Sequence, residues 1–314
     1  MPKALIIGVS GQDGTYLAKS LLKKGYQVIG SSRAVSDNEF LNLKAEGVFG
    51  RIELLQLDPN SYSEVLEALR KTGPGEIYNL AGQSSVGLSF ERPHETIESI
   101  TRPVVNLLEA VRVLEGQIRF FSAVSGDCFG GTDFPAGEDT PFNPGSPYAA
   151  AKAAAFWMTK NYRQAYGLFA CSGILFSHES PLRSEKFVIS KIIHAAQRIK
   201  NGAKEKLKLG DISVIRDWGW APEYVEGMHR MLQLESPDDF VLATGESNTL
   251  EALVNEAFLA FGLDWKDHVE YGAFSRPLDI KAEYANPDKA FKVLGWKAGL
   301  KMRDVVRAWV KALG

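Results

Sequence analysis

Apolar runs alternate with amphipathic stretches along the first 175 residues of the chain. The apolar runs predict strands at residues 4–7, 27–30, 51–57, 76–80, 119–122 and 169–175. The amphipathic stretches between them predict helices near residues 13–24, 62–71, 94–115 and 146–167. Because strands that alternate with helices pair in parallel, the pattern predicts an α/β fold with a doubly wound parallel Rossmann sheet.

The pattern changes to shorter, mixed elements from about residue 175. We expect residues 1–174, together with about 215–238, to form a dinucleotide-binding domain. Residues 175–214 and 239–314 are expected to form a smaller mixed α/β domain that binds the substrate. Such a domain would form the second wall of a cleft.

Three glycines follow the first predicted strand at a regular spacing. Gly8, Gly11 and Gly14 form a G-x-x-G-x-x-G pattern between this strand and the first predicted helix. The first two let the backbone turn tightly against a pyrophosphate, and the third allows close helix packing. Because a strand and a helix flank the glycines, they predict a dinucleotide site rather than an ordinary turn.

The end of the second predicted strand indicates which dinucleotide binds. Ser31, Ser32 and Arg33 stand where an acidic residue would favour NAD. A guanidinium binds phosphate oxygens with two hydrogen bonds, so the sequence favours NADP. The alternative is that Arg33 is a solvated loop charge.

Other candidate cofactor contacts follow the third and fourth predicted strands. Asp58 is placed to meet the adenine edge, although it also precedes a helix and is a candidate cap. Leu80 and Ala81 are expected to pass beneath the nicotinamide.

Four side chains form the candidate catalytic group. Tyr148 precedes Lys152 by one helical turn, and Ser125 and Asp127 lie upstream. A phenol with a pKa of about 10 is a poor base at neutral pH, and a nearby ammonium group is expected to lower that pKa. A Tyr-x-x-x-Lys pair alone is common in helices, but the glycine pattern favours a redox role.

Composition excludes several other classes of protein. The chain of 314 residues has 36 basic and 38 acidic residues, which gives no electrostatic footprint for nucleic acid. Two cysteines and the absence of a metal-ligand cluster predict no metal. The apolar runs are too short to cross a membrane, and the first residues lead directly into a strand pattern. We therefore expect a soluble cytoplasmic protein.

At this point the chain resembles the extended short-chain dehydrogenase/reductase family, and within it the GDP-mannose 4,6-dehydratase branch. The resemblance covers nearly the whole chain. Tyr148 and Lys152 are typical of the superfamily, whereas the His-Glu-Ser-Pro block at 178–181 and the Arg-Asp-Trp-Gly block at 216–219 are specific to the branch.

The resemblance implies a mechanism. Tyr148 would remove the 4-hydroxyl proton of a GDP-sugar while NADP takes the C4 hydride, and Lys152 would hold the nicotinamide ribose. Ser125 would donate a hydrogen bond to the 4-oxygen. A carboxylate would then take the C5 proton and assist loss of water from C6, and hydride return would give a 4-keto-6-deoxy sugar.

The chain departs from the branch at that carboxylate, because Asp127 stands where a Glu is usual. The shorter side chain sits about 1 Å farther back, which can cost on the order of 100-fold in rate, although Gly126 would let the loop advance. Two alternatives therefore stay open: a 4-ketoreductase, 4-dehydrogenase or epimerase on the same sugars, and a non-catalytic nucleotide-binding protein. For the dehydratase, we expect Asp127 to point into the cleft that holds the Tyr148 hydroxyl.

The resemblance also implies further binding residues and an assembly. Gln12 and Asp13 join the cofactor site. The substrate-binding residues implied are Ser84, Ser177, Glu179, Lys191, Arg216 and Arg276. For the two arginines, a surface salt bridge is the alternative to phosphate binding. Packing of the helices near 94–115 and 146–167 against a second copy would give a homodimer or homotetramer.

Overall fold

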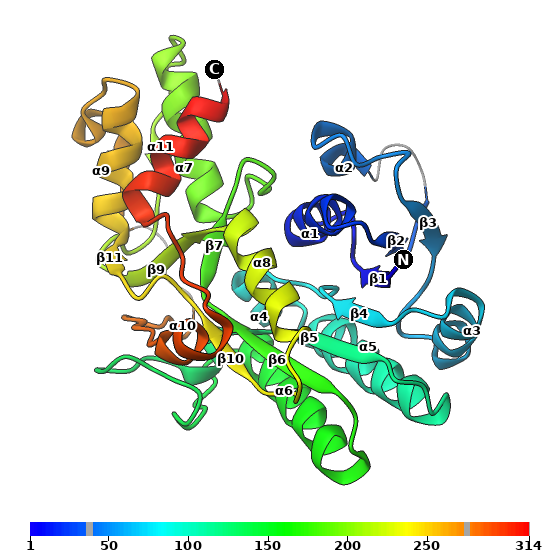
Figure 1. The fold of residues 1–314 in the computed structure, drawn as a ribbon. Helices are drawn as coiled ribbons and strands as arrows, with labels where there is room; N and C mark the ends of the chain where they lie inside the picture. Colours follow the sequence, from blue (N-terminus) through cyan, green and yellow to red (C-terminus); the bar gives the residue numbers. More distant parts are fainter. Residues whose placement is uncertain (36–39, 273–276, 314) are drawn as a thin grey trace.

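The computed structural model describes residues 1–35, 40–272 and 277–313, and its central feature is a seven-stranded sheet (Figure 1). The strand order is β10-β6-β5-β4-β1-β2-β3, and every neighbouring pair is parallel. The strands are β1 (Lys3–Ile7), β2 (Gln27–Ser32), β3 (Glu53–Gln56), β4 (Glu76–Asn79), β5 (Arg119–Ser125), β6 (Ala170–Leu175) and β10 (Phe240–Leu242). The predicted doubly wound parallel sheet is confirmed.

Helices cover both faces of this sheet because its strands are apolar on both sides. In β1, Ala4 and Ile6 face one core, and Leu5 and Ile7 face the other. The first core is covered by α1 (Gln12–Lys23), α2 (Leu41–Ala45), α8 (Ala221–Met231) and α10 (Asp288–Leu294). The second is covered by α3 (Tyr62–Thr72), α5 (Pro93–Val113) and α6 (Pro147–Tyr166), and the short α4 (Val86–Glu91) packs against α5 and α6.

Helix α6 begins and ends at residues suited to those positions. The Ser146 hydroxyl accepts a hydrogen bond from the Ala149 amide at the N-terminus, and Pro147 occupies the first turn. Gly167 ends the helix with a φ of 67°, a left-handed conformation that glycine adopts without strain. The helix therefore holds Tyr148 and Lys152 in its first two turns, next to β5.

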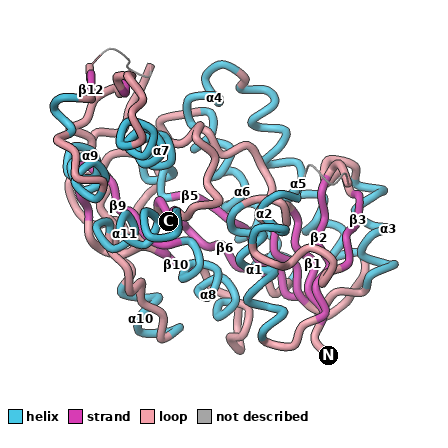
Figure 2. The backbone as a smooth tube through the Cα atoms, turned by 90° about the horizontal axis from the view of Figure 1, so that it is seen from above, coloured by secondary structure: helices cyan, strands magenta, loops and turns pink. Residues whose placement is uncertain are grey.

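A second group of elements packs at the β10 end of the large sheet, on the opposite side from β3 (Figure 2). Its three-stranded sheet contains β7 (Ser177–Glu179), β9 (Ile215–Trp220) and β11 (Ser247–Thr249). A two-stranded sheet contains β8 (Leu207–Lys208) and β12 (Val269–Glu270), and the helices are α7 (Val188–Lys200), α9 (Leu250–Ala260) and α11 (Met302–Leu313). These helices share a separate apolar core.

Two strands belong to a different sheet from the one expected from the sequence. Residues 215–220 were expected with the large sheet, but β9 pairs with β7 and β11 in the smaller one. Strand β10 follows residue 238, yet it pairs with β6 in the large sheet. Three buried residues are too short a run to predict a strand. The division of the chain into two domains stays a prediction.

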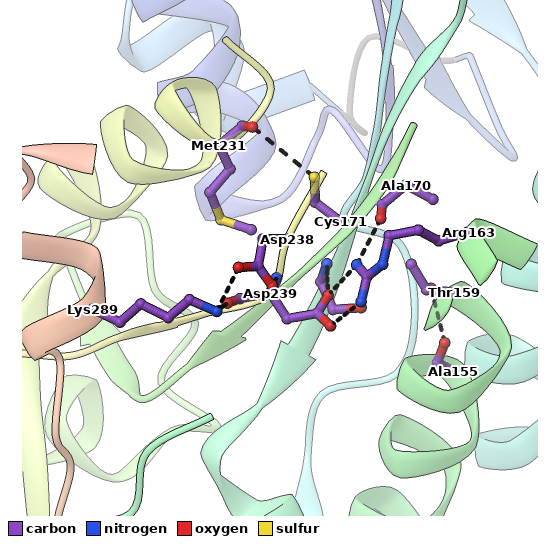
Figure 3. Close-up of polar contacts among 10 residues, drawn as sticks. Ala155, Thr159, Arg163, Ala170, Cys171, Met231, Asp238, Asp239 and Lys289 are labelled. Atoms are coloured by element: carbon purple, nitrogen blue, oxygen red, sulfur yellow. Dashed lines mark hydrogen bonds and ion pairs between the residues drawn. The ribbon is translucent and has the colours of Figure 1, made fainter. Parts of the chain in front are cut away.

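A buried ion pair ties α6 to the start of β10 (Figure 3). Arg163 Nη1 and Nη2 donate to the two carboxylate oxygens of Asp239 at 2.9 and 2.5 Å. Asp239 also accepts a hydrogen bond from the Ser172 amide of β6 at 2.8 Å. This pair fixes the C-terminal half of the helix whose first turns carry Tyr148 and Lys152.

No helix in the described ranges has the length and apolar character needed to cross a bilayer.

Candidate active site

A cavity of about 550 Å³ opens at the carboxyl ends of β1, β4, β5 and β6, where ligands bind in open parallel sheets. One wall is formed by the glycine turn after β1, the end of β5 and the start of α6. The other wall is formed by β7, β9 and residues 279–283. The cavity therefore lies between the two sheets, as expected for a two-substrate cleft.

The glycine turn is built for close backbone approach. Gly8 has a φ of 88°, and a Cβ there would meet the Ala81 backbone at 3.1 Å. A Cβ on Gly14 would lie 2.4 Å from the Gly8 carbonyl oxygen. Gly11 precedes α1, whose N-terminal residues line the cavity. The turn and the helix N-terminus fit the pyrophosphate of a dinucleotide.

Strand β7 is locked to this turn by buried polar contacts. His178 Nε2 lies 2.9 Å from Asp13 Oδ2, and Ser180 Oγ donates to Gln12 Oε1 at 2.8 Å. Burial raises the pKa of Asp13, but the charge and hydrogen bond of His178 outweigh it and lower the pKa to about 2. Burial lowers the pKa of His178, but Asp13 reverses this and raises it. His178 was seen in the sequence only as part of a motif, and it had no assigned role there.

The structure places all four candidate catalytic side chains at the cavity. Ser125, Asp127, Tyr148 and Lys152 all line it. Ser125 Oγ donates a hydrogen bond to Asp127 Oδ2 at 2.8 Å, and the Asp127 amide approaches the same hydroxyl at 3.3 Å. The expected placement of Asp127 in the cavity of Tyr148 is thus found, and its catalytic role stays a prediction.

Gly126 has a packing role between these residues. It opens the 3-10 turn η2 (Gly126–Phe129), which follows β5 directly. A Cβ at this position would meet the Phe176 ring at 3.0 Å. Glycine therefore lets the turn that carries Asp127 lie against the end of β6.

Lys152 does not act on Tyr148 as the sequence predicted. Burial and then the Asp127 carboxylate raise the pKa of Tyr148, while the Ser125 hydroxyl and Arg183 oppose them. Lys152 Nζ donates to the Ala123 carbonyl at 2.7 Å and lies 5.9 Å from the centre of the Tyr148 ring. Burial lowers the pKa of Lys152 to about 8. The expected lowering of the Tyr148 pKa is not found, because burial and the Asp127 carboxylate raise it, while the Lys152 ammonium donates to a carbonyl instead.

The remaining cofactor candidates lie at varied distances from the cavity. Leu80 lines it. Arg33 is exposed directly after β2, and Asp58 accepts a hydrogen bond from the Asn60 amide at 3.0 Å. The cap of α3 is Ser61 rather than Asp58. The cofactor roles of Arg33 and Asp58 stay predictions.

Some of the predicted substrate-binding residues line the cavity, and others do not. Ser84, Ser177 and Glu179 line the cavity. Lys191 is exposed, and its Nζ donates to the Lys208 carbonyl at 2.6 Å. Arg276 lies outside the described residues.

Arg216 lines the cavity, but carboxylates surround its guanidinium. Nη2 lies 3.4 Å from Asp279 Oδ1, and Nε lies 3.4 Å from Glu283 Oε1. Nη1 donates to the Ile215 carbonyl at 2.8 Å. Sequence reasoning missed Glu283, which belongs to no motif and reaches the site only through the tertiary fold.

The parallel sheet, the glycine turn before α1 and the Tyr148–Lys152 pair beside β5 define an extended short-chain dehydrogenase/reductase. The family model for GDP-mannose 4,6 dehydratase matches residues 5–309. The chain therefore belongs to the GDP-mannose 4,6-dehydratase family.

Curated relatives match over almost the full chain. GDP-mannose 4,6 dehydratase 1 of Arabidopsis thaliana is 43% identical over 98% of this chain and 88% of that protein. The GDP-mannose 4,6-dehydratase of Sinorhizobium fredii is 40% identical over 98% of this chain and 95% of that protein.

Solved structures share the fold. A UDP-glucose 4-epimerase of Thermus thermophilus in complex with NAD has a TM-score of 0.85 and 24% identity, with 98% of each chain covered. RMD from Pseudomonas aeruginosa in complex with NADPH has a TM-score of 0.81 and 20% identity, covering 99% of this chain and 98% of that one.

Proposed function

We propose that this chain converts GDP-mannose into its 4-keto-6-deoxy derivative by an NADP-dependent 4,6-dehydration. The observation that carries this proposal is the meeting of Ser125, Asp127 and Tyr148 in the cavity beside the glycine turn. A phenol and a carboxylate in one cavity supply the two proton acceptors that the reaction needs. Membership of the dehydratase family supports the same activity.

The residues present fit the dinucleotide. The glycine turn and the α1 N-terminus would hold the pyrophosphate, and Lys152 would reach the nicotinamide ribose. Arg33 would bind the adenosine phosphate, which favours NADP over NAD. When bound, the cofactor would supply the redox chemistry by taking a hydride from C4 and returning it at C6.

The chain's own groups would move the protons. Tyr148 would accept the C4 hydroxyl proton, while Ser125 orients the 4-oxygen through its hydroxyl. The resulting C4 ketone acidifies C5, so Asp127 would remove the C5 proton before water leaves from C6. Arg216 at the opposite wall would meet the diphosphate, together with Arg276. Ser177 and Lys191 would meet the nucleotide.

A homodimer through α5 and α6 is part of the proposal. The two helices pack against each other and expose large apolar side chains to solvent. These are Ile97 and Val113 on α5, and Trp157 and Tyr166 on α6. A second copy packed against α5 and α6 would cover part of this apolar surface.

The test is incubation of the NADP-loaded protein with GDP-mannose, without added reduced cofactor, followed by mass spectrometry. We expect a product lighter by one water. Tyr148→Phe should abolish it, and Asp127→Asn should slow it by roughly 100-fold or more while C4 oxidation persists. A 4-keto sugar with NADPH accumulation, but no water loss by the wild type, would overturn the dehydratase in favour of a 4-dehydrogenase.

A further inference from the structure

The η2 turn that carries Asp127 is tightly enclosed by its neighbours. At its start, a Cβ on Gly126 would meet the Phe176 ring at 3.0 Å. Just past its end, a Cβ on Gly130 would lie 2.4 Å from the Asn143 carbonyl oxygen. The turn is therefore pressed between the end of β6 and the segment that contains Asn143, and these neighbours set the position of Asp127.

Hydrogen bonds join the turn to the same segment and to α6. The Asn143 amide donates to the Cys128 carbonyl at 2.9 Å. Cys128 Sγ donates to the Ala149 carbonyl in the first turn of α6 at 3.5 Å. Ser125, by contrast, is the last residue of β5 and pairs with β6 in the large sheet. The sheet therefore holds Ser125, whereas the packing of the turn holds Asp127.

Phe142 packs behind this turn. Its ring centre lies 5.1 Å from that of Phe129, the last residue of the turn, in an edge-to-face arrangement. Phe156 of α6 supports the Phe142 ring at 4.8 Å, and Phe129 stacks on Phe176 at 6.2 Å. Phe142 is half-buried and is not among the described residues that line the cavity. Any effect of Phe142 on the cavity must therefore pass through the turn.

Removal of the Phe142 ring would leave a void behind Phe129. Protein interiors are close-packed, and neighbouring groups relax in part into a new void. The turn would then move back and carry Asp127 with it, and a misplacement of about 1 Å can cost on the order of 100-fold in rate. Ser125 on β5 and Tyr148 on α6 are held by other elements, so they would keep their positions.

We propose, on the basis of the dehydratase function above, that Phe142 is a positioning residue that sets the distance between the Asp127 carboxylate and the C5 and C6 atoms of the sugar. It takes no part in the oxidation at C4, which depends on Ser125 and Tyr148. Loss of water is therefore the step that depends on Phe142.

The test compares the wild type with Phe142→Ala in single turnovers of the NADP-loaded protein with GDP-mannose. The absorbance of the reduced nicotinamide follows C4 oxidation, and mass spectrometry of quenched samples follows loss of water. We expect water loss to slow by roughly 10- to 100-fold, so that reduced cofactor accumulates during the turnover. The rate of C4 oxidation and the affinity for GDP, measured by calorimetry, should stay close to those of the wild type.

Two further variants separate positioning from general damage. Phe142→Leu keeps most of the side-chain volume, so it should slow water loss less than Phe142→Ala does. If the alanine variant does not fold, the leucine variant is used alone, with the same selective slowing of water loss expected. The matched control is Phe261→Ala, a half-buried phenylalanine that packs against the core shared by α7, α9 and α11 and should leave both rates unchanged.

A double-mutant cycle with Asp127→Glu gives a signature that a merely structural role would not produce. The longer side chain extends the reach of the carboxylate by about 1 Å, which compensates for a turn that has moved back. Phe142→Ala should therefore slow water loss by a smaller factor in the Asp127→Glu background than in the wild type. A general loss of stability would give the same factor in both backgrounds.

Each other outcome has a definite meaning. Water loss at the wild-type rate in both Phe142 variants overturns the assignment, and so does equal slowing of C4 oxidation and water loss. The same factor in both backgrounds of the cycle overturns it as well. A wild type that oxidises C4 without losing water would instead overturn the dehydratase, and the role of Phe142 with it.

Discussion

Arg163 and Arg216, both largely covered by the fold, pair with carboxylates in different ways. Arg163 contacts Asp239 at 2.5 and 2.9 Å, and Lys289 contacts the neighbouring Asp238 at 2.7 Å (Figure 3). The Arg163 cluster therefore contains two cations and two anions. Asp239 also accepts a hydrogen bond from the Ser172 amide, and Asp238 accepts one from the Asp239 amide.

Arg216 lies 3.4 Å from Asp279 and 3.4 Å from Glu283. A balanced, hydrogen-bonded pair holds elements together, and breaking it leaves a buried charge. Burial of a carboxyl group in a cavity instead raises its pKa, as it does for Glu283. We expect the first pair to serve the fold, and we expect the residues around Arg216 to serve ligand binding.

The largest effect that would test this contrast is on stability at the Arg163 cluster. Arg163→Met should lower the free energy of unfolding by about 3–5 kcal/mol, because Asp239 stays buried without its cation. Glu283→Gln should not lower it at pH 6 and should raise it by up to about 2 kcal/mol, because the wild-type carboxyl must take up a proton on folding at this pH, whereas glutamine is neutral in both states. Urea denaturation of the two variants measures both. Equal losses would erase the distinction.

The second effect is a pH dependence that belongs to the Arg216 cluster. The pKa of Glu283 rises from 4.5 to about 8 on folding, so the folded state binds more protons between these values. Stability from this group is therefore fully present below pH 4.5 and is lost as the pH rises through about 8. The slope is at most about 1.4 kcal/mol per pH unit.

Other buried groups titrate in the same range, so the informative quantity is a difference between proteins. Burial raises the pKa of Asp217 to about 6, which gives the wild type a further slope of the same sign. Subtracting the stability of Glu283→Gln from that of the wild type at each pH isolates Glu283. The difference, wild type minus variant, should become more negative from pH 5 to pH 8. A difference that stays flat would show that Glu283 does not titrate in this window.

The sequence predicted most of the large sheet because its strands are long, apolar and regularly spaced. It placed the first helix within one residue of its observed bounds, and it placed Asp127 in the cavity of Tyr148. Local patterns carry this information, since each depends on neighbours in the chain.

The parts that were missed depend on contacts between distant segments. Strand β10 is three residues long, and only β6 identifies it as part of the sheet. Glu283 carries no motif, and its carboxyl group is in the cavity because β9 and residue 136 hold its segment. The predicted effect of Lys152 on the Tyr148 pKa was not found. The Ala123 carbonyl, which accepts the Lys152 hydrogen bond, cannot be placed from the sequence.

The smallest effect extends the contrast to a third arginine. Arg198 contacts Glu185 at 3.0 Å and Glu205 at 2.9 Å, so it has as many carboxylate partners as Arg216. Its side chain is 46% exposed, whereas that of Arg216 is 14% exposed. Solvent and salt screen charges at such a surface, so Arg198→Ala should cost less than about 1 kcal/mol, and less still at high salt.

This variant decides whether burial or the number of carboxylates sets the behaviour of an arginine cluster. Denaturation at low and high salt gives the answer directly. A loss above about 2 kcal/mol that persists at high salt would mean that carboxylate number matters more than burial. The expected small, salt-sensitive loss instead leaves burial as the property that separates Arg216 from Arg198.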